Sequence, residues 1–327
     1  MIVAHHFSVH GGFSYSNDQL LNKIFLLFFG SGGKVGVSVF VLISGYFLVR
    51  NGFALKKLGR YIVQVWGYSL VVLGVTFCLQ LPHGSGRELI RYLLPFGYMN
   101  WFAHAYLLLF LLTPFINKML LHLGKILFQR FLMLGFSLWY LIPTITGLLG
   151  LHMDMEGSIL MDFIFLYAVG AYIRLHEMDF YVKNAAWKTV GCYIAIVFFD
   201  LLCDWLHLRD VRGNLFYFAD INSALMLITS FYLFMVFKQL HLRHNYLINR
   251  IAATTFGVYL IHDSNLLRHF IWRDILQVNC WEENPFLPVY AIITVMFVFV
   301  LCGTIDFLRI QFLESFYNRW IDRILPK

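Results

Sequence analysis

The chain has 327 residues, of which 60% are hydrophobic and only 13% are charged, and its mean hydropathy is +0.69. Soluble domains carry about 25% charged residues, so this composition excludes an ordinary soluble domain and predicts an integral membrane protein. The net charge of +7 does not indicate a nucleic-acid partner, because the basic residues cluster between apolar runs. No polar stretch is long enough for a second domain, so we predict a single membrane domain over residues 1–327.

A helix that crosses a bilayer needs about 20 apolar residues. On this criterion the sequence predicts an all-α, polytopic integral membrane protein with about ten transmembrane helices. A short first span precedes Gly11, and residues 20–30 are expected to form a separate amphipathic or re-entrant piece. The remaining spans are expected at 35–49, 61–81, 101–121, 126–149, 158–173, 186–206, 215–237, 251–267 and 286–308.

Lysine and arginine are roughly twice as frequent on one side of these spans as on the other, which predicts that both termini are cytoplasmic. The first span covers only about 15 Å, half the hydrocarbon thickness. We therefore expect the first helix to be incomplete and the chain to be N-terminally truncated. The alternative is a genuine half-helix, which a bilayer tolerates only when neighbouring protein buries it.

Three histidines, His5, His6 and His10, lie in this first span, just before the Gly11–Gly12 break. Ionisable groups inside a membrane are costly and usually functional. Imidazole suits proton transfer near neutral pH, so the histidines are candidates for a general base. The alternative is that one or two of the rings simply hydrogen-bond to neighbouring backbone.

Two other stretches stand out, one rich in small residues and the next rich in basic residues. Residues 36–48 are rich in glycine and serine, which favours close helix packing, with a narrow acyl channel as the alternative. The following loop carries Lys56, Lys57 and Arg60, and the last two share a face if the loop is helical. Such a cluster fixes topology, binds anionic headgroups or holds the phosphates of a nucleotide-like cofactor. On the residue pattern alone, topology is favoured.

The spans at 101–121 and 251–267 also carry polar residues. Trp101 and His104 share a helical face, with Tyr106 close by. His262 and Asp263 end the second of these spans, and as sequence neighbours they point about 100° apart on a helix, so each is expected to find another partner. No Walker loop, Rossmann fingerprint, HExxH zinc site or GxSxG elbow is present, and we expect no metal.

Taken together, these stretches resemble the acyltransferase-3 family of bacterial membrane O-acetyltransferases. The similar segments follow the family's order: MIVAHHFSVHGG (1–12), GVSVFVLISGYFL (36–48), KKLGR (56–60), NWFAHAYLLLFLLTPFIN (100–117), FLYAVGAYI (165–173) and TFGVYLIHD (255–263). The resemblance implies a multi-pass protein of the bacterial inner membrane that takes an acetyl group from cytoplasmic acetyl-CoA. The acceptor would be a hydroxyl of a surface polysaccharide or a lipid-linked glycan, with polysaccharide-assembly proteins as candidate partners.

The resemblance also assigns roles to residues. His5 matches the family's catalytic first-helix histidine, with His6 as the alternative. Lys57 and Arg60, with Lys56 beside them, resemble the basic pair of the inner loop and would bind acetyl-CoA. The residues expected to bind substrate are Trp101, His104, Tyr106 and His262.

Two departures from the family pattern bear on these expectations. The arginine usually found about ten residues before the first histidine would precede Met1, and no SGNH-type domain follows the last span. One alternative function is a sugar or oligosaccharide exporter that uses the same histidines as proton-relay groups. Another is an inactive structural partner of a polymer synthase, which the missing arginine favours.

Overall fold

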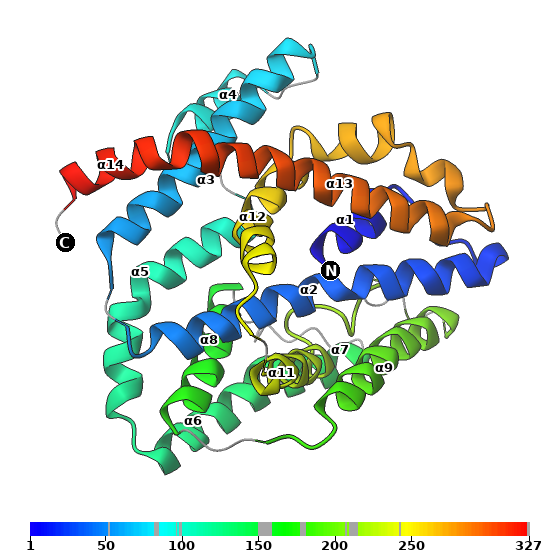
Figure 1. Ribbon diagram of the computed structural model, residues 1–327. Helices are drawn as coiled ribbons and strands as arrows, with labels where there is room; N and C mark the ends of the chain where they lie inside the picture. Colours follow the sequence, from blue (N-terminus) through cyan, green and yellow to red (C-terminus); the bar gives the residue numbers. More distant parts are fainter. Residues whose placement is uncertain are drawn as a thin grey trace. The chain divides into compact units, whose positions relative to one another are not determined.

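The computed structural model describes residues 1–51, 53–81, 85–95, 97, 100–149, 159–176, 181–206, 208, 215–241 and 243–325. It is 81% helical, and the described part of the chain has no strand, which confirms the predicted all-α membrane fold (Figure 1). Six of the described helical segments are long and apolar enough to cross a membrane: Asn17–Leu48, Leu55–Cys78, Trp101–His122, Lys125–Leu148, Ala185–Trp205 and Leu287–Ile324.

The chain forms two compact units. The first comprises Met1–His5, Lys23–Phe53 and Leu108–Leu242, and the second comprises His6–Asn22, Ala54–Leu107 and Arg243–Lys327. Helices α1, α2 and α5 contribute residues to both. The bounds of the principal helices are α1 Ile2–His10, α2 Leu20–Leu48, α3 Leu55–Cys78, α4 Gly86–Leu93, α5 Trp101–His122, α6 Lys125–Phe136, α7 Ile142–Leu148, α8 Ile159–Leu175, α9 Ala185–Trp205, α11 Ala224–Gln239, α12 Tyr246–His262, α13 Leu287–Arg309 and α14 Ser315–Ile324.

Helix α2 corrects one expectation. The predicted break between residues 30 and 35 is absent, and α2 runs without interruption over 29 residues. Gly33, which lies in the expected break, makes room for the N-terminal segment, because a Cβ on Gly33 would lie 2.2 Å from Cγ of His5. In this helix glycine therefore serves close packing rather than termination.

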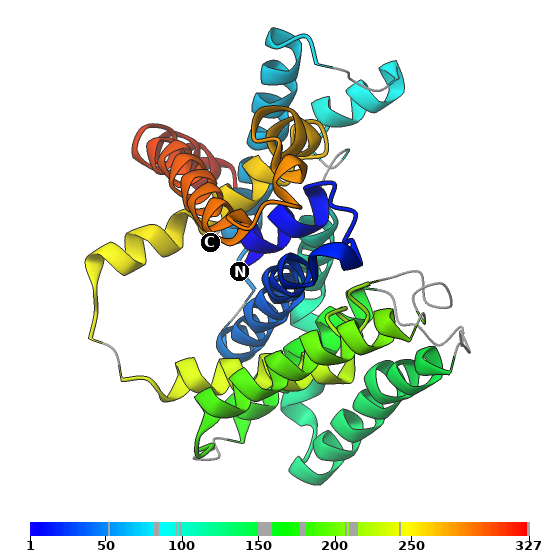
Figure 2. The same cartoon turned by 90° about the vertical axis from the view of Figure 1, so that its right-hand side faces the viewer.

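In the first unit, small residues also bring α2 and α8 together. A Cβ on Gly45 would lie 2.1 Å from the carbonyl oxygen of Tyr167, and one on Gly170 would lie equally close to that of Leu42. This confirms packing as the role of these small residues. Helices α9 and α11 lie side by side in the same unit (Figure 1 and Figure 2). The span expected to start at 215 becomes helical only at Ala224, and Ser158 lies outside the described residues.

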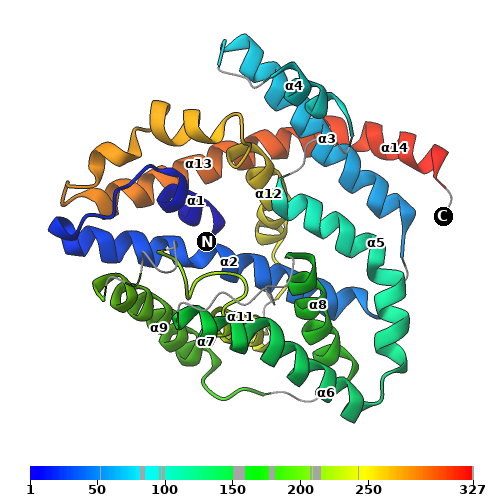
Figure 3. The same ribbon diagram turned by 180° about the vertical axis from the view of Figure 1, so that it is seen from behind.

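The second unit contains α3, α4, the start of α5 and helices α12 to α14. Helix α14 packs across the beginning of α3, where a Cβ on Gly59 would meet Leu325 at 2.9 Å (Figure 3). Helices α12 and α13 touch at Gly257, because a Cβ there would lie 2.1 Å from the carboxyl group of Asp306. Asp306 in turn accepts a hydrogen bond of 2.5 Å from the hydroxyl of Tyr68 in α3. Neither α4 nor α14 was expected from the sequence.

Candidate active site

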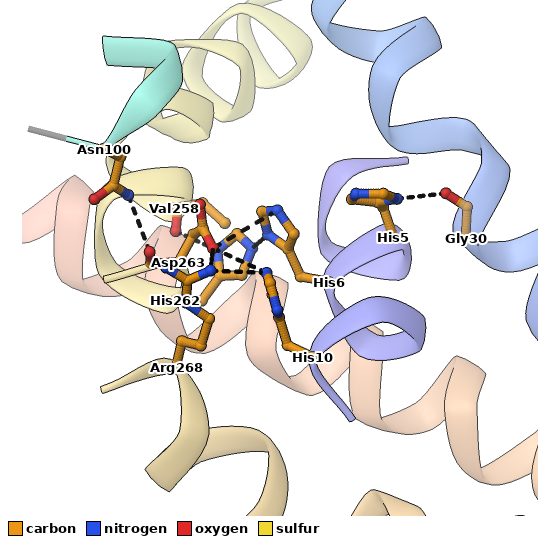
Figure 4. Close-up of polar contacts among 9 residues, drawn as sticks. All are labelled: His5, His6, His10, Gly30, Asn100, Val258, His262, Asp263 and Arg268. Carbon is orange, nitrogen blue, oxygen red and sulfur yellow. Dashed lines mark hydrogen bonds and ion pairs between the residues drawn. The ribbon is translucent and has the colours of Figure 1, made fainter. Parts of the chain in front are cut away.

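Helix α1 carries the histidines of the N-terminal segment. His5 and His6 project from it in different directions, as successive residues of a helix must (Figure 4). Nδ1 of His5 lies 2.5 Å from the carbonyl oxygen of Gly30 in α2. His6 and His10 are one helical turn apart, and their ring centroids lie 5.1 Å apart. Both point toward the end of α12 (Figure 4).

The ring of His6 is held by His262. Nδ1 of His6 lies 2.8 Å from Nε2 of His262, and Nδ1 of His262 lies 2.6 Å from the carbonyl oxygen of Val258. A carbonyl only accepts, so Nδ1 of His262 carries the proton and Nε2 of the neutral ring is an acceptor. His6 must then donate from Nδ1, and its lone pair lies on Nε2. The helix backbone thus fixes the tautomers of both rings.

The basic nitrogen of His6 faces a buried carboxylate. Nε2 of His6 lies 3.7 Å from Oδ1 of Asp263, and Nε2 of His10 lies 3.4 Å from the same oxygen. Within the described residues this oxygen is buried and has no hydrogen-bond partner. The backbone of Asp263 is fixed by Asn100, whose side-chain amide donates to its carbonyl over 3.0 Å. An imidazolium formed at His6 would therefore stand beside a negative charge.

Arg268 completes this cluster. Its Nη1 lies 3.2 Å from Nε2 of His10 and 3.7 Å from Oδ1 of Asp263. The ring of Trp272, which is fully buried, meets that of His262 edge to face at 6.3 Å. The cluster thus combines imidazoles, one carboxylate and one guanidinium beside an apolar wall, where charges interact more strongly than in water.

Part of this cluster also has the spacing of a metal site. Among the described residues, His6, His10 and Asp263 offer ligand atoms that all lie within 4.8 Å of one another. The guanidinium of Arg268, however, lies 3.2 Å from the nitrogen that His10 would use as a ligand. Arginine is always charged, so it would repel a cation at this position. The donor set therefore suits proton transfer better than it suits a metal ion.

Of the residues expected to bind substrate, only one belongs to this cluster. His262 lies in the cluster, whereas His104 is exposed on α5. The ring centroid of Tyr106 lies 5.8 Å from that of Tyr61 and 5.9 Å from that of Phe102. Trp101 follows Asn100, the residue that holds Asp263. The expectation that His262 and Asp263 each find a partner other than one another is confirmed, and His6 contacts both of them.

Sequence reasoning did not assign Asp263, Arg268 or Asn100 to the site. The separation of four residues between His6 and His10 was the available signal, because it places both rings on one face of a helix. No residue spacing in the sequence links Asp263 to these histidines. Its partners come from α1, from the segment after α12 and from the start of α5, which are remote from one another in the sequence.

The basic residues expected to bind acetyl-CoA lie in the first two turns of α3. Asp322 of α14 pairs with Nζ of Lys56 at 3.2 Å and with Nη2 of Arg60 at 3.3 Å. Lys57 is exposed. The helical start confirms that Lys57 and Arg60 share a face, and the structure adds a carboxylate to the cluster.

A family model described as an acyltransferase domain matches residues 1–304 of the chain. No curated protein and no solved structure matches the chain. The match covers the helices that carry the histidine cluster. Six other helical segments in the described part of the chain are long and apolar enough for a multi-pass membrane protein. The chain therefore belongs to the acyltransferase-3 family of membrane proteins, which transfer acyl groups.

Proposed function

We propose that this protein moves an acetyl group from cytoplasmic acetyl-CoA to a hydroxyl of a surface polysaccharide or lipid-linked glycan. The observation that carries the proposal is the placement of the basic nitrogen of His6 at 3.7 Å from the buried carboxylate of Asp263. Acyl transfer to a hydroxyl needs a base of this kind, because an alcohol is a weak nucleophile until its proton is removed.

The proposed reaction is a single acyl transfer. The acceptor hydroxyl gives its proton to Nε2 of His6 while its oxygen attacks the thioester carbonyl carbon. The carbon–sulfur bond then breaks, and the CoA thiolate takes the proton from the imidazolium, so the products are an ester and free CoA thiol. Asp263 would stabilise the imidazolium, and the guanidinium of Arg268, 3.7 Å from Asp263, would stabilise the developing oxyanion.

His6 and His5 are both supported as bases, by different contacts. A bond from Nδ1 of His5 to the Gly30 carbonyl leaves its Nε2 basic, as the bond from His6 to His262 does for that ring. The Asp263 carboxylate favours His6, because a nearby negative charge stabilises the protonated ring. We therefore assign the base to His6 and retain His5 as the alternative.

We propose that Lys57, Arg60 and Lys56 hold the phosphates of acetyl-CoA. Arginine and lysine are the usual phosphate partners. Among the described residues, Asp322 is the carboxylate that pairs with Lys56 and Arg60, so the three cations leave this part of α3 with an excess of positive charge. Trp101, Tyr106 and His104 remain candidates for acceptor binding near the start of α5.

The test is reconstitution of the full chain in vesicles with acetyl-CoA and candidate glycans. The proposal requires that CoA thiol is released in step with the appearance of base-labile acetyl esters on the glycan. Glycan crossing the membrane without thiol release would instead support an exporter. A deletion strain should also lose acetyl esters from its surface polysaccharide, and unchanged esters would contradict the assigned acceptor.

A further inference from the structure

An apolar groove of about 470 Å³ lies between α3 and the helical segment α13–α14 in the second unit. Its walls include Val71, Ile305 and Leu308, whose exposed fractions are 59%, 42% and 48%. These helices are long and apolar enough to cross a bilayer, so side chains exposed along them face hydrocarbon. The groove is therefore open to lipid, and its apolar walls suit an acyl chain.

The groove has one polar end. Gln64, Arg309 and Tyr317 line it there, and Arg309 is paired with Asp306. Gln64 lies one helical turn after Arg60 on the same face of α3. The groove thus begins beside the basic cluster of Lys56, Lys57 and Arg60, whose three positive charges exceed the one carboxylate, Asp322, that pairs with them in the described part of the chain.

Helix α14 adds an interfacial surface at this end. Phe312, just before α14, and Phe316, Trp320 and Ile324 within it recur every four residues and are 70%, 72%, 58% and 56% exposed. On another face of the helix, Ile321 is buried near Gly59 of α3. An amphipathic helix with an exposed aromatic stripe lies at the boundary between headgroups and acyl chains. The polar end of the groove is therefore at headgroup level.

We propose that this groove binds one anionic phospholipid of the bilayer, with its phosphate at Lys56 and Arg60 and an acyl chain along Gly67 and Val71. Head and tail are adjacent in a phospholipid, as the basic cluster and the groove are here. In acyl-CoA, by contrast, the pantetheine arm separates the phosphates from the acyl group. The site is distinct from the proposed acyl transfer at His6. Its phosphate contacts, however, use Lys56 and Arg60, two of the three residues proposed to hold the phosphates of acetyl-CoA, so the lipid and acetyl-CoA would compete for them.

Glycines in α3 offer a matched pair of variants. A Cβ on Gly67 or on Gly74 would meet no atom within 4 Å, so both positions accept a larger side chain. Of the two, Gly67 lines the groove and Gly74 does not. Gly67→Phe should fill the groove, and Gly74→Phe is the control for a bulky residue on the same helix. Neither glycine is the proposed base or one of the residues proposed to hold the phosphates of acetyl-CoA.

The experiment is native mass spectrometry of the full chain after reconstitution in vesicles of equal phosphatidylglycerol and phosphatidylcholine. The wild type and Gly74→Phe should each retain one phosphatidylglycerol, and Gly67→Phe should retain at least about tenfold less. Lys56→Ala with Arg60→Ala should keep a bound lipid but lose about tenfold or more of the preference for phosphatidylglycerol. Thermal unfolding of each variant shows whether a loss reflects the groove or misfolding.

Three results would overturn the proposal. Gly67→Phe could retain as much phosphatidylglycerol as Gly74→Phe, or the wild type could retain both lipids equally. The spectra could instead show a dimer that Gly67→Phe abolishes, which would mean that a second chain covers the groove. Acyl-CoA turnover is measured on the same samples. A wild-type protein that binds phosphatidylglycerol but does not consume acyl-CoA would contradict the proposed function and leave the lipid site standing.

Discussion

Nδ1 of His6 donates to Nε2 of His262 over 2.8 Å, although the two residues are 256 positions apart in the chain. The donor and acceptor roles follow from the second contact of His262, in which its Nδ1 donates to the carbonyl oxygen of Val258, one turn earlier in α12. This arrangement leaves the lone pair of His6 on Nε2, 3.7 Å from Oδ1 of Asp263, before any substrate binds. Such preorganisation is what a general base requires.

His6→Ala should lower the rate of acyl transfer by about 10²- to 10⁴-fold, because it removes the proposed base. Acetyl-CoA consumption and glycan ester formation are measured together in vesicles. Membrane insertion should be unchanged. His5→Ala is the matched variant and should retain more activity than His6→Ala. The reverse order would return the base to His5.

Asp263→Asn should lower the rate by about tenfold or more while keeping the shape of the residue, because the amide cannot stabilise an imidazolium. Asp274→Asn is the control, since Asp274 is an exposed carboxylate on the segment that follows. Equal rates in the two variants would show that the charge of Asp263 has no part in the reaction.

Lys57→Ala with Arg60→Ala should raise the KM for acetyl-CoA and leave the acceptor KM unchanged. Asp322→Asn should act in the opposite direction, because it removes the carboxylate that competes for Lys56 and Arg60. The effect of Asp322→Asn should be modest, about fivefold at most, since exposed ion pairs contribute about 1 kcal/mol or less. A higher acceptor KM with unchanged acetyl-CoA dependence would contradict the proposal that Lys57 and Arg60 hold the phosphates of acetyl-CoA.

Gly257→Ala should destabilise the protein by about 1–3 kcal/mol, because the added methyl group would overlap the carboxyl group of Asp306. Gly74→Ala is the control, since its Cβ meets open space on α3. Thermal unfolding in detergent compares the two. An unchanged melting temperature for Gly257→Ala would show that α12 and α13 separate readily.

A metal chelator should leave acyl transfer unchanged. The reason is the guanidinium of Arg268, which stands 3.2 Å from the ring nitrogen of His10 and opposes a cation there. The measurement is CoA thiol release before and after treatment with EDTA. Loss of activity that added zinc restores would identify His6, His10 and Asp263 as metal ligands.

The sequence predicted the membrane class and most helices because length and hydropathy are local properties. It placed α3, α5, α9 and α13 within several residues of their observed bounds. It failed at α2, where two separate pieces were expected and Gly33, between them, packs against His5 in one continuous helix. From the sequence alone, a glycine is compatible with either a helix break or a close contact, and the neighbouring element decides between them.

The sequence by itself determined that imidazole and basic groups lie in and beside apolar spans, because residue type and hydropathy require no partner. Only the tertiary structure decided which of these groups meet. It brought Asp263 and Arg268 to His6 and His10, and it placed Asp322 between Lys56 and Arg60. These contacts join segments distant in the chain, and residue spacing reports only on neighbours along one helix.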